Sequence, residues 1–224
     1  MLKRRILINL LVIVMAFSFT SCINIVEKVF FKKNGSGTYT MTLDMSKVAN
    51  MLTMFGEDEM TEMEDAMNGM NEGFEQAKAK LEGVTGISNI NQEMDKKTLT
   101  YTMAFDFRDV DALNDGLNRY FANEDDNGEY TYFTSKKKQF TRTSMDRFSK
   151  ALNEEMASSE DSHFDPAILM GDAYFESILI FEKDIKSHSN TDYKKDGNRK
   201  ISLKKFFFNK ISEGKSLAVT VKTK

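Results

Sequence analysis

A short sequence motif occurs twice in this chain and constrains its fold more than any other feature. The four residues Thr-Tyr-Thr-Met at positions 38–41 recur unchanged at positions 100–103. In both copies apolar and polar residues alternate, which is the period of a half-buried strand. A helix start follows each copy, with Ser46 and Asp109 as candidate N-caps. We therefore expect one structural unit to be used twice.

Each copy of the motif is preceded by a turn and by another strand-like segment. The dipeptide Asn34-Gly35, a strong hairpin signal, follows the segment 23–31, and a turn beginning at Asp95 follows the segment 87–94. The predicted unit is thus a hairpin followed by a helix, or ββα.

The rest of the chain is expected to repeat this unit once more and then to consist of strands alone. A third, weaker copy covers residues 130–157. Beyond it, residues 174–181 are apolar enough for a buried central strand, and Asp196-Gly197 marks a further hairpin. Strands joined by tight turns run antiparallel. The expected fold is therefore α+β, an antiparallel sheet with helices packed on one face and an all-β C-terminal third.

The N-terminal segment has the layout of an export signal. Basic residues at positions 3–5 precede an apolar run over residues 6–19, which is shorter than the roughly 20 residues of a membrane span. Small residues then lead into Cys22, the only cysteine in the sequence, and this arrangement resembles the lipobox of a bacterial lipoprotein signal. The resemblance implies cleavage before Cys22 and lipidation of its thiol. The alternative is a cytosolic protein with an apolar N-terminus and a buried thiol.

Cleavage at this site defines the expected domain organisation. Residues 1–21 form the signal peptide, and residues 22–224 form a single periplasmic α+β domain, with subdomains of residues 22–122 and 123–224 as the alternative. Loss of three cations takes the formal net charge from −3 to about −6, which disfavours nucleic acid as a partner. With Cys22 lipidated, no thiol is left for a disulfide, so the core must hold without one.

The residues after Cys22 bear on where the protein lies. A strand-like segment begins at once, without a polar tether, so the domain is expected to lie close to the membrane. No Asp follows the cysteine. By resemblance to known sorting signals, this implies a lipid anchor in the outer membrane, facing the periplasm. The membrane is thus the first expected partner.

A methionine-rich segment is the main candidate for a binding site. Apolar residues at alternating steps of three and four lie on one face of a predicted helix: Met60, Met63, Met67, Met70, Phe74, Ala77, Leu81 and Val84. The simplest interpretation is that this face packs on the sheet as core. Paired methionines also suit Cu(I), but no histidine is nearby, so we predict no metal site and no cofactor.

A second interpretation of this helix is functional. Methionine side chains adapt to varied apolar ligands, and Gly69 and Gly73 would make the helix easy to bend. Met60, Met63, Met67, Met70 and Phe74 would then form a lid over a groove for lipid or for a hydrophobic peptide.

The sequence carries no signature of a catalytic site. Its two histidines, His163 and His188, lie in polar stretches that predict loops, without the spacing of a triad or a zinc site. The sequence contains no phosphate-binding glycine loop and no Gly-x-Ser-x-Gly motif. We therefore expect a non-enzymatic protein.

Charge is unevenly distributed along the chain. Residues 44–75 carry nine acids and one lysine, whereas residues 183–224 carry twelve lysines or arginines and four acids. A basic C-terminal sheet edge would suit anionic headgroups. The alternative is that these lysines protect exposed edge strands from pairing with other chains.

The segments after the signal also resemble a known family in outline. The strand that begins at Cys22, the turn at 34–37 and the closing strands at 174–182, 200–203 and 217–222 resemble the plan of LppM-like envelope lipoproteins. The resemblance implies an α+β domain at an envelope membrane with a role in lipid binding, and it carries over no site residues.

Two functions are compatible with these observations. The first is a non-enzymatic binding module for lipid or hydrophobic peptide. The alternative is a structural or assembly partner in an envelope protein complex, recognised through its sheet edges. An apolar cavity under the methionine-rich helix would favour the first, and a flat exposed apolar patch the second.

Overall fold

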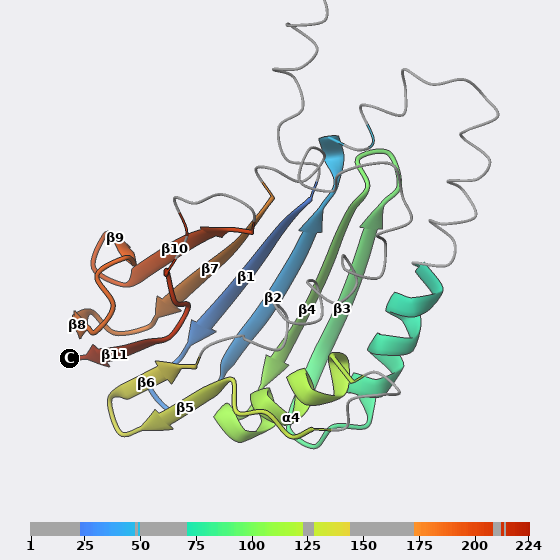
Figure 1. Cartoon of the computed structure of the whole chain (residues 1–224). Coiled ribbons are helices and arrows are strands. Elements are labelled where there is room, and N and C mark those ends of the chain that lie inside the picture. Colours follow the sequence, from blue (N-terminus) through green and yellow to red (C-terminus); the bar gives the residue numbers. More distant parts are fainter. Residues whose placement is uncertain are drawn as a thin grey trace, which may run out of the picture.

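The computed structural model describes residues 23–47, 49, 71–122, 128–143, 173–207, 212 and 214–224. Within these residues the chain is mostly β-strand, arranged in two sheets, with helices beside them (Figure 1). The mixed content fits an α+β protein.

The larger sheet contains seven strands. In spatial order they are β3 (Ile87–Asp95), β4 (Thr100–Phe107), β2 (Gly37–Asp44), β1 (Asn24–Phe31), β7 (Tyr174–Phe181), β10 (Lys200–Phe206) and β9 (Lys194–Asp196). The smaller sheet has the order β5 (Phe133–Lys136), β6 (Gln139–Arg142), β11 (Val219–Thr223) and β8 (Ile185–His188).

The two copies of the sequence motif lie on neighbouring strands of the larger sheet and meet at their last residues. Strands β2 and β4 pair antiparallel with Met41 opposite Met103, the last residue of each copy. This is the one pair of equivalent residues that lie opposite each other, because the two strands run in opposite directions. The hairpins β1–β2 and β3–β4 are therefore related by a local two-fold axis at this pair. The helix α4 (Val110–Tyr120) follows β4. Helical residues begin at Ser46 after β2, but most of that segment lies outside the described residues, so the complete ββα repeat stays a prediction.

The expectation of a purely antiparallel sheet is wrong at the centre of the molecule. Strand β1 pairs in parallel with β7, with Val29 opposite Leu179. A tight turn fixes direction only between consecutive strands, and β7 follows β6 after the long connection through residues 144–172. The strands expected for the third copy, β5 and β6, belong to the second sheet instead of extending the first.

Several sequence-based expectations in the C-terminal part are confirmed, and one is wrong. Strand β7 is central, between β1 and β10, and Gly197 takes a positive φ of 68° in the predicted hairpin between β9 and β10. His188 was expected in a loop but is the last residue of the short strand β8. The polar sequence of this strand gives no apolar alternation from which it could be predicted.

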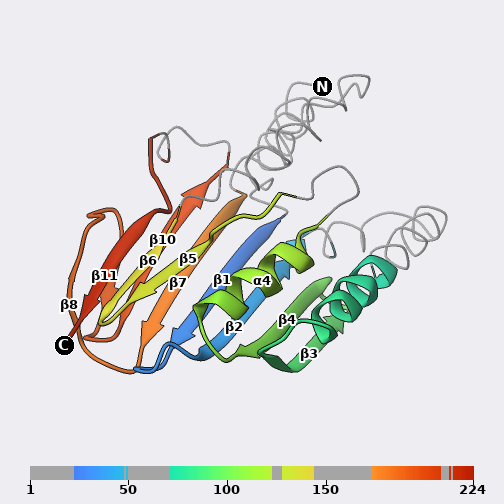
Figure 2. The same ribbon diagram turned by 90° about the horizontal axis from the view of Figure 1, so that it is seen from below.

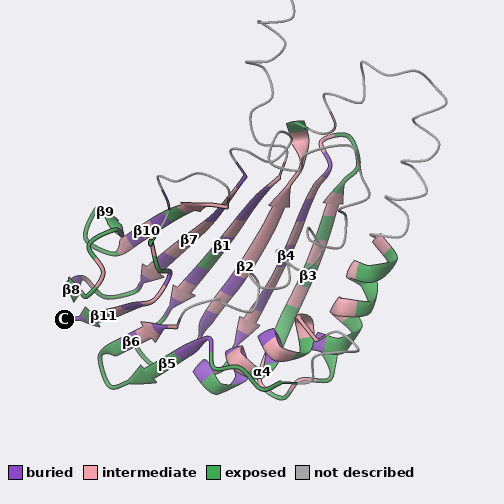
Figure 3. Cartoon of the chain, viewed as in Figure 1, coloured by how far each residue is buried: buried purple, intermediate pink, exposed green. Residues whose placement is uncertain are grey.

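The core lies on one face of the larger sheet, here called the inner face (Figure 2 and Figure 3). Phe133 and Phe140 of the second sheet pack on Phe31, with ring centroids 5.8 and 4.9 Å from its ring. Gly116 of α4 lies against Ile87, close enough that a Cβ would be 3.2 Å from its side chain. The described helices thus pack on a single sheet face.

Two helical segments cover this face beside the second sheet. Asp109 caps α4 as expected, because its carboxylate accepts a hydrogen bond of 2.9 Å from the backbone N–H of Ala112. The other segment is helical from 71 to 82, so Val84, expected on its apolar face, lies in the bend beyond its end.

Candidate functional site

The predicted binding residues fall partly within the described structure. Phe74 lies in the helical segment 71–82. The remaining predicted residues lie outside the described residues: Cys22, Met60, Met63, Met67 and Met70.

Phe74 packs directly on the larger sheet. Its ring stacks on Tyr101 of β4, with centroids 3.4 Å apart and planes inclined by 6°. Leu81 lies on the same face of this helical segment, about two turns after Phe74, and is fully buried. Phe74 and Leu81 therefore confirm, for their part of the helix, the expectation that its apolar face packs as core.

The inner face near Phe74 is organised in rows that cross the sheet, because paired strands place opposite side chains next to each other. The row that includes Tyr101 consists of Met94, Tyr101, Leu43, Ile25 and Phe175. This row lies where β1 begins, and β1 starts at Asn24, two residues after Cys22.

In this row Tyr101, Ile25 and Phe175 are buried, whereas Leu43 and Met94 are half-buried. A row further along β1 consists of Phe105, Tyr39, Val29, Leu179 and Ile201, and none of these is more than 2% exposed. By contrast, several apolar side chains at the near end are only partly buried against the core. We call them the apolar end cluster: Met41, Leu43, Phe74, Met94 and Tyr120. Apolar surface therefore stays accessible at the end of the sheet from which the chain continues toward Cys22.

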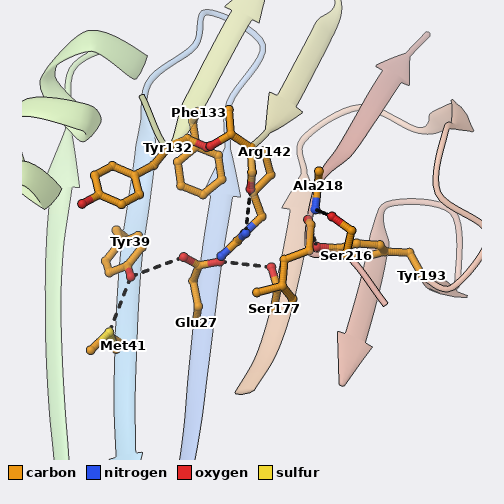
Figure 4. A network of polar contacts seen from close by, with 12 residues as sticks. Glu27, Tyr39, Met41, Tyr132, Phe133, Arg142, Ser177, Tyr193, Ser216 and Ala218 are labelled. Carbon is orange, nitrogen blue, oxygen red and sulfur yellow. Dashed lines mark hydrogen bonds and ion pairs between the residues drawn. The ribbon is translucent and has the colours of Figure 1, made fainter. Parts of the chain in front are cut away.

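Between these two rows lies a buried ion pair that joins the sheets (Figure 4). Arg142 of β6 donates from Nε to Oε2 of Glu27 on β1 at 2.7 Å, and the two side chains are 1% and 2% exposed. Ser177 of β7 donates its hydroxyl to the same carboxylate oxygen at 3.0 Å. Tyr39 of β2 donates to the other oxygen at 3.5 Å. The carboxylate thus has partners from three strands besides its own.

The guanidinium of Arg142 is held by further contacts. Its Nη1 donates to the carbonyl oxygen of Thr143 at 2.9 Å. The guanidinium carbon Cζ lies 5.9 Å from the ring centroid of Phe133 and 5.6 Å from that of Phe175. Its Nη2 has no hydrogen-bond partner among the described residues. Burial alone would lower the pKa of Arg142, but the Glu27 carboxylate raises it, so the guanidinium stays charged.

The pKa values of two tyrosine phenols near this pair are raised by their surroundings. Burial, reinforced by the Glu27 carboxylate, raises the pKa of Tyr39 well above its ordinary value. Burial also raises the pKa of Tyr193 to about 12, against the opposing effect of Arg142. Both phenols stay protonated at neutral pH and act as hydrogen-bond donors. Tyr193, for example, donates to the carbonyl oxygen of Leu217 at 2.8 Å.

The buried pair was not predicted from the sequence, although a signal for it exists. Glu27 alternates with Ile25, Val29 and Phe31, so it occupies an inward position of an otherwise apolar strand face. A carboxylate at such a position requires a buried partner. The sequence alone does not say which of its many basic residues supplies it.

Comparisons with known proteins were made against families, curated proteins and solved structures. No protein-family model matches the chain, and the search of curated proteins gives no match. Among solved structures, the chain is similar to the NMR structure of the folded domain of LppM from Mycobacterium tuberculosis, with 6% sequence identity and a TM-score of 0.43 over 92% of this chain and 91% of that chain.

The described residues offer little for metal or redox chemistry. They contain no group of three or more His, Cys, Asp or Glu side chains placed to hold a metal ion. The ring of His188 contacts the carbonyl oxygen of Asn190 through Nδ1 at 2.9 Å. None of the helices within the described ranges is both long and apolar enough to cross a membrane.

Proposed function

We propose that this chain is a membrane-anchored envelope lipoprotein that binds a lipid acyl chain or a hydrophobic peptide and has no enzymatic activity. Lipidated Cys22 would hold it in the outer membrane, facing the periplasm. The observation that supports the proposal best is the partial exposure of the apolar end cluster, at the end of the larger sheet where β1 begins.

The composition of the cluster fits an apolar ligand. Exposed apolar area costs about 25 cal/mol per Å², so an acyl chain lying on Met41, Leu43 and Met94 would be stabilised by covering them. Methionine side chains adjust to ligands of different shape. The position near Cys22 would let lipid enter from the anchoring membrane.

A fatty-acid binding assay tests this proposal. Leu43→Glu places a charge within the cluster, and we expect it to weaken binding of the fluorescent fatty acid cis-parinaric acid about tenfold or more. The matched control is Thr42→Glu, which places the same charge one residue away on the opposite sheet face and should leave binding unchanged. Leu43→Trp, which stays apolar but fills space, should also weaken binding without unfolding the protein.

Two results would contradict the proposal. One is the absence of cis-parinaric acid binding by the wild-type chain. The other is equal binding by Leu43→Glu and Thr42→Glu. Native mass spectrometry of protein purified without detergent provides a second measurement, in which co-purified lipid is the expected result.

A role as a structural or assembly partner is the second candidate function, and one observation favours it. The face of the larger sheet opposite the core carries half-buried Val26, Phe30, Ile178 and Ile180 on β1 and β7. The described helices and the second sheet all pack on the inner face. A photo-crosslinking residue at position 178 that captures envelope proteins, with no capture from position 43, would support this second role.

A further inference from the structure

A pocket with six lysines lies at the end of the molecule remote from the apolar end cluster. It has a volume of about 460 Å³, and the lysines that line it are Lys32, Lys33, Lys137, Lys138, Lys183 and Lys224. We call it the basic pocket. Glu182 also lines it, so the side chains carry five net positive charges, and a free carboxyl group at Lys224 would offset one of these.

The lysines come from four separate parts of the chain, all at strand ends. Lys32 and Lys33 lie in the β1–β2 turn, and Lys137 and Lys138 form the two-residue turn between β5 and β6. Lys183 follows β7, and Lys224 follows β11. Protection of sheet edges does not explain this arrangement, because none of these residues lies along an edge strand.

Backbone hydrogen bonds hold the four segments together. Glu182 donates its N–H to the carbonyl oxygen of Phe31 at 2.9 Å, and its carboxylate accepts the N–H of Lys33 at 2.7 Å. Thr223 donates its N–H to the carbonyl oxygen of Lys138 at 2.9 Å. Lys224 donates its N–H to the carbonyl oxygen of Asp184 at 2.9 Å. The frame of the pocket is thus fixed in the absence of a ligand.

The acids nearby offset the lysines only in part. Lys32 is one of the groups that lower the pKa of Asp106, after the hydrogen bonds from Thr38 and Asn89. The carboxylate of Glu182 is engaged with the backbone, and Asp184 pairs with Arg199 at 3.1 Å and with Lys224 at 3.3 Å. Each of the other five lysines is exposed and makes no ion pair with a residue that the structure describes. Like charges gathered in this way repel one another, so their arrangement is unfavourable until an anion binds.

The turn that carries Lys137 adds an independent observation. Lys137 takes a φ of 57°, a conformation that glycine or asparagine adopts at lower cost in a two-residue hairpin turn. The sequence nevertheless places lysine there. The floor of the pocket is formed by Phe31, Phe140 and Phe181, whose ring centroids lie 4.9 to 5.6 Å apart and which are at most 6% exposed. Since the rings expose so little area, the rim lysines and not the floor would supply the affinity.

We propose that the basic pocket binds a ligand that carries several phosphate groups. Lysine ammonium groups bind phosphate oxygens as point charges, and a pocket of this volume is of the size that holds small polar molecules. The pocket lies at the Phe31 end of β1, seven residues and about 23 Å from the start of this strand at Asn24. With Cys22 as the anchor and β1 directed away from the membrane, this distance would exceed the screening length of about 8 Å at physiological salt, so headgroups beside the anchor would not occupy the pocket. The inference is independent of acyl-chain binding at the opposite end.

The test uses the full chain held in nanodiscs of zwitterionic lipid. One probe is tripolyphosphate, measured by titration calorimetry, and the other is free vesicles of phosphatidylcholine with one-fifth phosphatidic acid, measured by co-flotation. The pocket variant combines Lys32→Gln, Lys138→Gln and Lys183→Gln. The control combines Lys96→Gln, Lys194→Gln and Lys195→Gln, which changes the net charge equally at exposed lysines outside the pocket.

We expect the pocket variant to bind at least one of these probes tenfold or more weakly than the wild-type chain, and the control to bind within twofold of it. Loss of tripolyphosphate binding identifies a soluble phosphate ligand, and loss of vesicle binding alone identifies a lipid headgroup of a facing membrane. The proposal is overturned if the wild-type chain binds neither probe, or if both triple variants lose binding equally. Cis-parinaric acid binding should be unchanged in the pocket variant, so the two sites are tested separately.

Discussion

Glu27 and Arg142 are the side chains whose chemistry departs most from that of the surrounding core. Each is almost completely removed from water, and each charge is compensated mainly by the other at 2.7 Å. Desolvating two charges is costly, so such a pair is retained for what it specifies as much as for the stability it provides. Here it fixes how the smaller sheet sits on the larger one.

Removal of one partner should therefore be far more damaging than removal of both. Arg142→Met leaves the Glu27 carboxylate buried and unpaired, and we expect it to lower the free energy of unfolding by about 3 to 5 kcal/mol. The double variant Glu27→Leu, Arg142→Met should recover most of this loss. Urea denaturation of the wild-type chain, of Arg142→Met and of the double variant measures their free energies of unfolding.

An exposed ion pair provides the control. Arg199 and Asp184 lie 3.1 Å apart, with side chains 64% and 30% exposed, so Arg199→Met should cost less than about 1 kcal/mol. If Arg142→Met proved no more destabilising than Arg199→Met, the interpretation of the buried pair as the connection between sheets would be wrong.

At the scale of the elements, two glycines have opposite consequences. Gly37 begins β2 at a crowded position, where a Cβ would overlap the carbonyl oxygen of Phe30 and lie 2.7 Å from the ring of Phe107. Gly73 lies in the helical segment 71–82, with no heavy atom within 4 Å of where its Cβ would be. The first glycine is required by packing, whereas the second only weakens its helix.

Alanine substitution should separate the two cases. Gly37→Ala forces the β1–β2 hairpin apart, and we expect a destabilisation of about 1 to 3 kcal/mol or more. Gly73→Ala should stabilise the protein by about 0.5 to 1 kcal/mol, because alanine favours a helix interior. Thermal unfolding of the two variants is the measurement, and shifts in the same direction would contradict the local geometry at one of them.

The elements that could be predicted from the sequence are those whose signals are local. Asn34-Gly35 and Asp196-Gly197 marked real hairpins because positive φ angles at Gly35 and Gly197 are set by the turn itself. The partner of β7 could not be predicted in this way, since its parallel pairing with β1 joins residues about 150 positions apart. For the same reason the basic pocket was invisible in the sequence, where its lysines are scattered over four segments.

At the scale of the whole molecule, β1 connects the two proposed sites. It begins two residues after Cys22, passes the buried ion pair at Glu27, and ends at Phe31 on the floor of the basic pocket. The apolar end cluster would thus lie near the anchoring membrane, and the basic pocket would point away from it. This polarity follows from strand direction alone, and it holds only if Cys22 carries the anchor.

Paramagnetic relaxation in nanodiscs tests this polarity and the anchor together. With gadolinium attached to lipid headgroups, the methyl signals of Leu43 should be broadened more strongly than those of Ile185, because the effect falls steeply with distance and β1 separates the two ends by about 23 Å. Cys22→Ser should release the protein from membranes, or leave the leader uncleaved, and abolish the difference between the two methyl groups. Unchanged membrane attachment and processing in Cys22→Ser would show that the chain is not a lipoprotein. Stronger broadening at Ile185 in the anchored wild-type protein would reverse the orientation, and would place the lysines, not the apolar end cluster, against the membrane.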